Sequence, residues 1–90
     1  MAQLRCQVAD GLRPAEASIT VRDHSGKSEH FPLDRGMVTD EDGATSIPVF
    51  LIQYSDDRDY ALVGLPVEAD SGSHRIWVKA ADLEVLEPVH

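Results

Sequence analysis

Two consecutive segments of this chain are apolar on both sides, and this feature constrains the fold more than any other. Segment 47–54 reads Ile-Pro-Val-Phe-Leu-Ile-Gln-Tyr, and segment 60–67 reads Tyr-Ala-Leu-Val-Gly-Leu-Pro-Val. Successive side chains of a β-strand point to opposite faces, so strands of this composition need cover above and below. Val49 and Leu51 are expected on one face. The other face is predicted to carry Phe50, Ile52 and Leu62.

Turn signals bound these segments and make them the first strands of a meander. The charged run 55–59 joins them, and the Gly-Ser turn 69–73 leads to a further strand at 74–79. The sequence therefore predicts three antiparallel strands in chain order. Residues 80–83 are too few for a stable α-helix and predict a single 3-10 turn. A last short strand is expected at Val85 and Leu86.

The N-terminal part alternates with period two, which is typical of half-buried strands. Residues 3–8 place Cys6 on the apolar side, where it is expected to be a small core residue. Residues 16–22 and 28–33 predict a hairpin around a glycine turn. Pro32 lacks a backbone donor, so the returning strand is expected at a sheet edge.

Three smaller features carry expectations of their own. Leu12, between two turn signals, is a candidate apolar anchor, and Met37 with Val38 is another in the irregular interval 34–46. Gly64 inside a strand predicts a bulge or a close backbone approach.

No stretch shows a sustained helical period, so the predicted fold class is all-β. Short strands at even spacing predict a small barrel or β-sandwich of about six to seven short antiparallel strands with one 3-10 turn. The 90 residues are expected to form a single domain, 1–90. A chain of this length buries a modest share of its surface, which favours oligomerisation.

Net charge and cysteine content limit the kinds of function that this protein can have. Lys and Arg total 8 against 16 Asp and Glu, giving a net charge of −8 that disfavours nucleic-acid binding. Solubility is the simplest explanation of this acidity; attraction to a basic partner and mimicry of nucleic acid are the alternatives. The lone cysteine cannot form an internal disulfide. The sequence shows neither a membrane-length apolar run nor a signal-peptide core at its start, so a cytoplasmic location is expected.

Residues for catalysis, metals or cofactors are not predicted. The four histidines lack metal-site spacing. The acidic turn 40–43 does not match the ligand register of a calcium loop. Residues 25–28 share the end of a phosphate-binding loop but lack its first glycine and its helix.

Trp77 is the residue that points most clearly to a binding surface. It lies opposite Ile76 and Val78, so it should not belong to the same core, and Arg75 is next to it on that side. Aromatic residues and arginine are enriched at interaction hot spots. Either the N-terminal hairpin covers Trp77, or Trp77 and Arg75 join the second apolar face in an interface.

The C-terminal third carries a resemblance to known folds. Tyr60 to Pro88 resembles the end of SH3-like barrels, with a distal hairpin at 70–72, a core pair at Ile76 and Val78, and Leu83 closing the barrel. Within it, Tyr60-Ala61-Leu62, Gly72-Ser73, Ile76-Trp77, Ala80-Ala81 and Leu83-Glu84 are similar to the C-terminal part of the plasmid-type, trimethoprim-resistant dihydrofolate reductases.

That resemblance implies a tetramer around a shared pore. Members of that family line the pore with a Gln-Ile-Tyr triplet, where this chain has Arg75-Ile76-Trp77. The chain is also similar in size and style to small proteins carried on mobile gene cassettes.

The sequence thus favours an acidic, non-enzymatic binding or assembly module. It is expected to form a homo-oligomer or bind a protein partner through its second apolar face, without nucleic acid or membrane. The alternatives are an oligomeric barrel enzyme with a shared ligand pore, similar to dihydrofolate reductase, and an acidic decoy of a nucleic-acid-binding protein.

Overall fold

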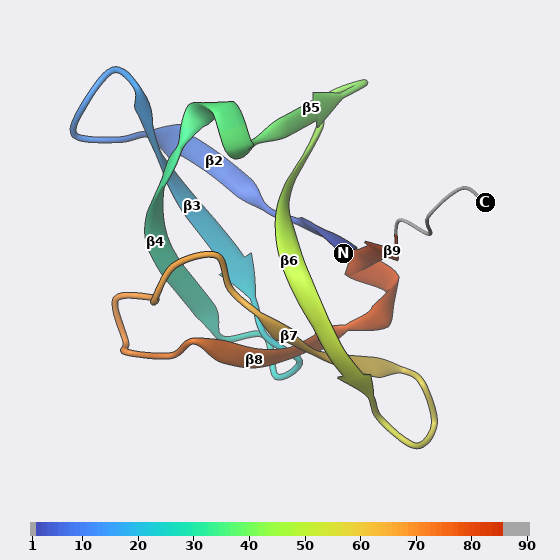
Figure 1. The fold of residues 1–90 in the computed structure, drawn as a ribbon. Helices are drawn as coiled ribbons and strands as arrows, with labels where there is room; N and C mark the ends of the chain where they lie inside the picture. The colour runs from blue at the N-terminus through green and yellow to red at the C-terminus, as the bar shows by residue number, and fades with distance from the viewer. Residues whose placement is uncertain (1, 86–90) are drawn as a thin grey trace.

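Short strands account for most of this computed structural model, which describes residues 2–85 (Figure 1). The strands are β1 (Ala2–Arg5), β2 (Gln7–Asp10), β3 (Glu16–Arg22), β4 (Ser28–Asp34), β5 (Thr39–Glu41), β6 (Ala44–Tyr54), β7 (Tyr60–Gly64), β8 (Arg75–Lys79) and β9 (Leu83–Val85). Two 3-10 turns, η1 (Arg35–Met37) and η2 (Ala80–Asp82), interrupt them. The all-β prediction is confirmed, although the described residues form nine strands and two such turns rather than six to seven strands and one turn.

The strands form two antiparallel sheets. The larger sheet has the order β8-β7-β6-β1-β9, with β5 attached to β6, and the smaller sheet has the order β2-β3-β4. The predicted meander is confirmed as β6, β7 and β8. Since the ladders of the two sheets stay separate, the architecture is an open sandwich and not a closed barrel.

The predicted strand 3–8 is divided at Cys6, where the chain passes from one sheet to the other. β1 pairs with β6 and β9 in the larger sheet, whereas β2 pairs with β3 in the smaller one. The Cys6 amide donates to the Thr45 carbonyl at 3.0 Å, and Thr45 Oγ1 donates to the Cys6 carbonyl at 2.6 Å. These bonds use the backbone groups that the change of sheet would otherwise leave unpaired.

One apolar core lies between the sheets. Its members come from the inward positions of both sheets and from the loop after β7, and they include Cys6, as predicted. The buried hydrophobic residues are Ala2, Leu4, Cys6, Ala17, Ile19, Val21, Phe31, Leu33, Ile47, Val49, Ala61, Val63, Leu65, Ala69, Ile76 and Val78.

A carboxylate is also buried in this core. Glu29 alternates inward with Phe31 and Leu33 along β4, and Ser71 Oγ donates a 2.8 Å hydrogen bond to its Oε2. Buried charges require such partners, since desolvation without a hydrogen bond is costly. The loop between β7 and β8 therefore supplies a polar contact that β4 needs.

Two further backbone bonds connect the sheets at their edges. The Asp70 amide donates to the His30 carbonyl at 2.8 Å, and the His24 amide donates to the Trp77 carbonyl at 2.7 Å. The edge position predicted from Pro32 is confirmed, because β4 has a ladder partner on one side only. The loop at Asp70 and the turn at His24 thus fasten the small sheet to the large one.

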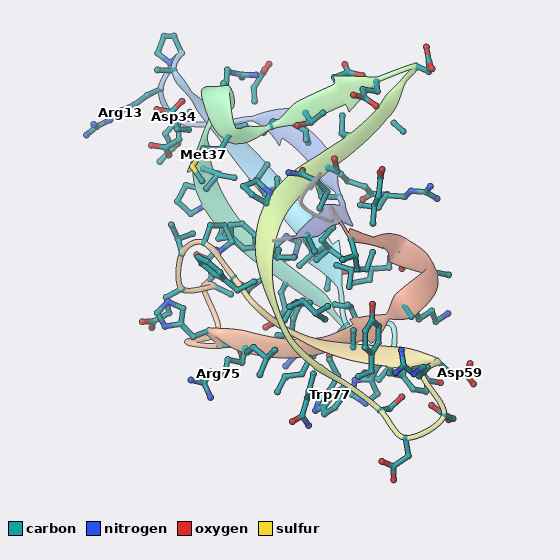
Figure 2. All side chains as sticks on the ribbon, turned by 45° about the vertical axis from the view of Figure 1, so that its right-hand side comes forward. Arg13, Asp34, Met37, Asp59, Arg75 and Trp77 are labelled. Carbon is teal, nitrogen blue, oxygen red and sulfur yellow. The ribbon has the colours of Figure 1, made fainter. Side chains whose placement is uncertain are left out.

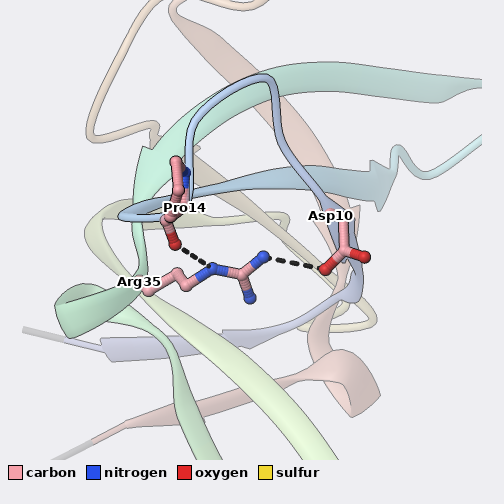
Figure 3. A network of polar contacts seen from close by, with 3 residues as sticks. All are labelled: Asp10, Pro14 and Arg35. Atoms are coloured by element: carbon pink, nitrogen blue, oxygen red, sulfur yellow. Dashed lines mark hydrogen bonds and ion pairs between the residues drawn. The ribbon is translucent and has the colours of Figure 1, made fainter.

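Arg35 fixes the connection between β2 and β3 (Figure 3). Its Nε donates to the Pro14 carbonyl at 2.9 Å, and its guanidinium lies 2.9 Å from Asp10 Oδ1. Leu12, at the tip of this connection, is 99% exposed, so the prediction that it anchors the chain is wrong. The connection between β2 and β3 is therefore held by the polar contacts of Arg35 and not by burial of an apolar side chain.

The second predicted anchor, Met37 with Val38, is confirmed for only one of its two residues. Val38 packs against the core, whereas Met37 is 41% exposed. Met37 is the last residue of η1, and Val38 follows it in extended conformation. The two side chains therefore point in different directions, and only that of Val38 reaches the core.

Candidate functional site: the outer face of β6, β7 and β8

The strands β6, β7 and β8 present an apolar surface on the side away from the core. The register sets Leu62 opposite Trp77, and sets Gly64 opposite Phe50 on one side and Arg75 on the other. Phe50 is 61% exposed and Ile52 is 43% exposed, while Leu62 and Trp77 are half-buried. We call Phe50, Ile52, Leu62 and Trp77 the outer apolar face.

A β-bulge in β6 shapes this surface. Leu51 pairs with Val63 and Gln53 pairs with Leu62, which leaves Ile52 as the extra residue. Because the extra residue shifts the alternation by one, Gln53 joins the outer side and Tyr54 packs against the core. Gly64 predicted a bulge in its own strand, β7, but the bulge lies in the neighbouring strand β6.

Gly64 instead leaves space for its neighbours. A methyl group built on Gly64 would lie 3.5 Å from Phe50 Cβ and 3.8 Å from Ile52 Cδ1. The side chains of Phe50 and Ile52 therefore lie over the backbone of Gly64, which has no side chain of its own. β7 also ends at Gly64, three residues earlier than the segment 60–67 predicted.

The N-terminal hairpin lies beside Trp77. The His24 amide, in the turn between β3 and β4, donates to the Trp77 carbonyl, and the His24 ring meets the Tyr60 ring edge-on with centroids 5.9 Å apart. Trp77 is half-buried in this setting, whereas Phe50 and Ile52 stay exposed. The centre of the exposed surface is thus displaced from Trp77 toward β6.

Charged residues stand at both ends of the outer apolar face. Arg75, Trp77 and Asp59 follow one another along the lower part of Figure 2, far from Arg13 at the top. Arg75 borders the end marked by Gly64, and the β6–β7 turn, residues 55–59, borders the other. Arg75 and Lys79 lie on the outer side of β8, and the β6–β7 turn carries Asp56, Asp57, Arg58 and Asp59.

Hydrogen bonds order the acidic turn. Asp57 Oδ1 accepts from Ser55 Oγ at 2.6 Å and from the Asp59 amide at 3.0 Å. The bond from Ser55 holds the pKa of Asp57 below its ordinary value of 3.8. Arg58 lies 5.3 Å from the centre of the Tyr54 ring, which places its charge over an aromatic face.

The triplet 75–77 does not line a single surface. Ile76 is buried in the core, whereas Arg75 and Trp77 lie on the outer side of β8. Strand alternation separates the middle residue from the other two.

A polar groove of about 410 Å³ lies on the outer side of the larger sheet, where β1 meets the β5–β6 hairpin, η2 and β9. Its side chains come from segments far apart in the sequence, which is why sequence analysis did not reveal it. The charged and amide residues that line it are Gln3, Arg5, Glu41, Asp42, Asp82 and Glu84. Within residues 2–85, no group of three His, Cys, Asp or Glu side chains is arranged to hold a metal ion.

Cys6 does not contribute a reactive thiol to this surface. Burial raises its pKa, and a hydrogen bond with Thr45 opposes the shift only in part. A thiol with a raised pKa is a weak nucleophile at neutral pH.

Comparison with known proteins returned no match among family models, curated proteins or solved structures. Among the helical turns of the described residues, none is long and apolar enough to cross a membrane.

Proposed function

We propose that this protein is a non-enzymatic binding module that docks another protein on its outer apolar face. The observation that carries the proposal is the exposure of Phe50 and Ile52 on β6, a strand whose opposite side contributes to the core. Apolar side chains that stand together on a rigid sheet, with charged residues around them, are typical of interaction sites. Function therefore resides in a surface and not in a pocket with reactive groups.

The architecture supports such a role. The core on the inner side of β6, β7 and β8 fixes the backbone from which the outer side chains project. Preorganised aromatic and aliphatic anchors lose little conformational freedom on binding. Leu62 and Trp77 are half-buried, which gives the exposed pair Phe50 and Ile52 an apolar surround.

A photo-crosslinking amino acid at position 50 tests the proposal in cells. Position 12 is the matched control, because Leu12 is apolar and fully exposed but lies outside the outer apolar face. We expect one discrete adduct from position 50, lost when Ile52→Asp is added, and none from position 12. Adducts of equal yield from both positions, or no adduct from position 50, would overturn the proposal.

A further inference from the structure

We propose that a pocket at the junction of β1 and β2 binds a phosphate group between the guanidinium groups of Arg5 and Arg22. The pocket has a volume of about 210 Å³, and its lining residues are Arg5, Cys6, Gln7, Thr20, Arg22 and Asp82. It shares no residue with the outer apolar face, so this inference goes beyond the proposed function and does not depend on it. Two observations carry it: the register that brings the two arginines to one place, and the lack of an ion pair to either.

The strand register brings together two arginines that are distant in the sequence. β2 follows β1 directly after Cys6, and Gln7 stands opposite Thr20 on β3. If this register continued by two residues, Arg5 would stand opposite Arg22, on the face that Gln7 and Thr20 share. Because β1 instead pairs with β6 and β9, the ladder with β3 ends here, and both arginine side chains line the pocket at the junction.

Neither arginine of the pocket is neutralised by an ion pair. Within residues 2–85, the one ion pair joins Arg35 to Asp10. Like charges at facing positions of neighbouring strands destabilise a sheet. Arg5 and Arg22 are both exposed, so a ligand from solution can reach them. An anion that contacts both guanidinium groups would remove the repulsion between them.

The acid in the pocket does not offset both bases. Asp82 belongs to η2 and is half-buried, and the β1–β9 register continued by one residue places it beside Arg5. The Cys6 thiol adds no negative charge, because burial raises its pKa. One carboxylate against two guanidinium groups leaves the pocket positive, in a chain whose net charge is −8.

The donors of the pocket favour a phosphate group over a carboxylate. A guanidinium group donates two parallel hydrogen bonds to two oxygens of one anion. A carboxylate has two oxygens and satisfies one guanidinium group in this way, whereas a tetrahedral phosphate has oxygens for two. The side-chain amide of Gln7 is a further donor in the same pocket.

The surroundings restrict the ligand to a small one. Arg5 and Asp82 also line the polar groove over β1, whose other charged residues are Glu41, Asp42 and Glu84. A nucleic acid that reached the pocket would bring further phosphates against these carboxylates, which repel them. The pocket therefore suits inorganic phosphate or the phosphate group of a small ester.

Titration of the full chain with inorganic phosphate at constant ionic strength, followed by the amide chemical shifts in NMR spectra, tests the site. We expect saturable shifts at residues 5–7 and 20–22. Arg5→Gln and Arg22→Gln should each raise the dissociation constant by about tenfold or more, because charge-assisted hydrogen bonds are lost. Arg13→Gln is the matched control, since it makes the same charge change at an exposed residue outside the pocket and should leave the constant unchanged. Circular dichroism and thermal unfolding verify that each variant is folded.

Asp82→Asn should change binding in the opposite direction. Removal of the carboxylate makes the pocket more positive, so phosphate should bind more tightly. Glu84→Gln is its control, because it removes one negative charge from the neighbouring groove and not from the pocket, and its effect should be smaller.

Two further probes define the ligand. Phenyl phosphate distinguishes the sources of the phosphate group: tighter binding than inorganic phosphate assigns the pocket to esters, and weaker binding assigns it to the free ion. Acetate should bind more weakly than either.

The proposal is overturned by any of four results: no saturable shift with either phosphate compound, equal losses in Arg13→Gln and the two pocket variants, equal effects of Asp82→Asn and Glu84→Gln, or acetate binding as tight as that of phosphate. The crosslink from position 50 is unaffected by all of them, so this inference and the proposed function fail separately.

Discussion

The side chain of Phe50 packs over the bare backbone of Gly64, with Cβ 3.5 Å from the position that a methyl group on Gly64 would occupy. This separation is an ordinary van der Waals contact. Gly64 lies in a strand, where glycine is less favourable than alanine because it loses more conformational freedom on folding. The site therefore has room for a side chain that the sequence does not supply.

Gly64→Ala is expected to stabilise the protein. The added methyl group contacts Phe50 and Ile52 without a clash, and the free energy of unfolding should rise by about 0.5–1 kcal/mol. Urea denaturation at equilibrium measures the change. Gly11→Ala is the matched opposite, because its methyl group would lie 2.6 Å from the Glu16 carbonyl oxygen and should destabilise the fold. A loss of stability in Gly64→Ala would contradict this account of the outer face.

Ser71→Ala should destabilise the protein through Glu29. The substitution removes the 2.8 Å hydrogen bond to a buried carboxylate, and an unsatisfied buried group of this kind costs about 1–3 kcal/mol. Denaturant unfolding gives the value. Ser73→Ala is the control, because Ser73 Oγ lies 3.1 Å from Ser71 Oγ and does not contact Glu29. Equal losses in both variants would show that Glu29 does not depend on Ser71.

Asp57→Asn should reduce the loss of folding stability that occurs as the pH falls into the acidic range. The folded protein holds the pKa of Asp57 below 3.8, so the unfolded chain binds a proton first as the pH falls. Stability from this carboxylate is present above the unfolded pKa and is lost as the pH falls through the folded pKa. Thermal unfolding between neutral and strongly acidic pH measures the slope.

The matched control for that series is Asp56→Asn, in the same turn. It removes one negative charge without removing the hydrogen bonds that Ser55 and Asp59 give to Asp57. If both variants flatten the curve to the same degree, then net charge and not the ordered turn accounts for the effect.

Arg35→Ala should cost more stability than Asp10→Ala, although the two residues form an ion pair. The Asp10 side chain is 98% exposed, so its loss should change the free energy of unfolding by less than about 0.5 kcal/mol. Arg35 also donates to the Pro14 carbonyl, which adds about 1 kcal/mol to the effect of its removal. Chemical denaturation of both variants compares them, and equal effects would show that the bond to Pro14 contributes nothing.

Much of the fold was predictable from local patterns. β3, β4 and the meander follow from alternation and turn residues, since each is a local signal. The edge position of β4 followed from one missing donor at Pro32. The division of the first strand at Cys6 was not predictable, because alternation continues across the residue while the hydrogen-bond partners change from β6 to β3.

The candidate site was predictable in its composition but not in its shape. Two-sided apolarity singled out Phe50, Ile52, Leu62 and Trp77, and all four lie on the side predicted for them. Their exposure could not be read from the sequence, because it depends on which distant segments pack over the outer side; the turn at His24 lies beside Trp77, whereas Phe50 and Ile52 stay exposed. The inward turn of Tyr54 depends on the bulge at Ile52, and a strict period of two assigns that ring to the wrong face.

The position of β1 between β6 and β9 has a consequence for synthesis. The first residues of the chain pair with residues 46–49 and 83–85, both of which leave the ribosome later. Contacts this distant in sequence are slow to form. The large sheet is therefore complete only when residues 83–85 have been translated, and until then β1 lacks its β9 neighbour even if β6 has already paired with it.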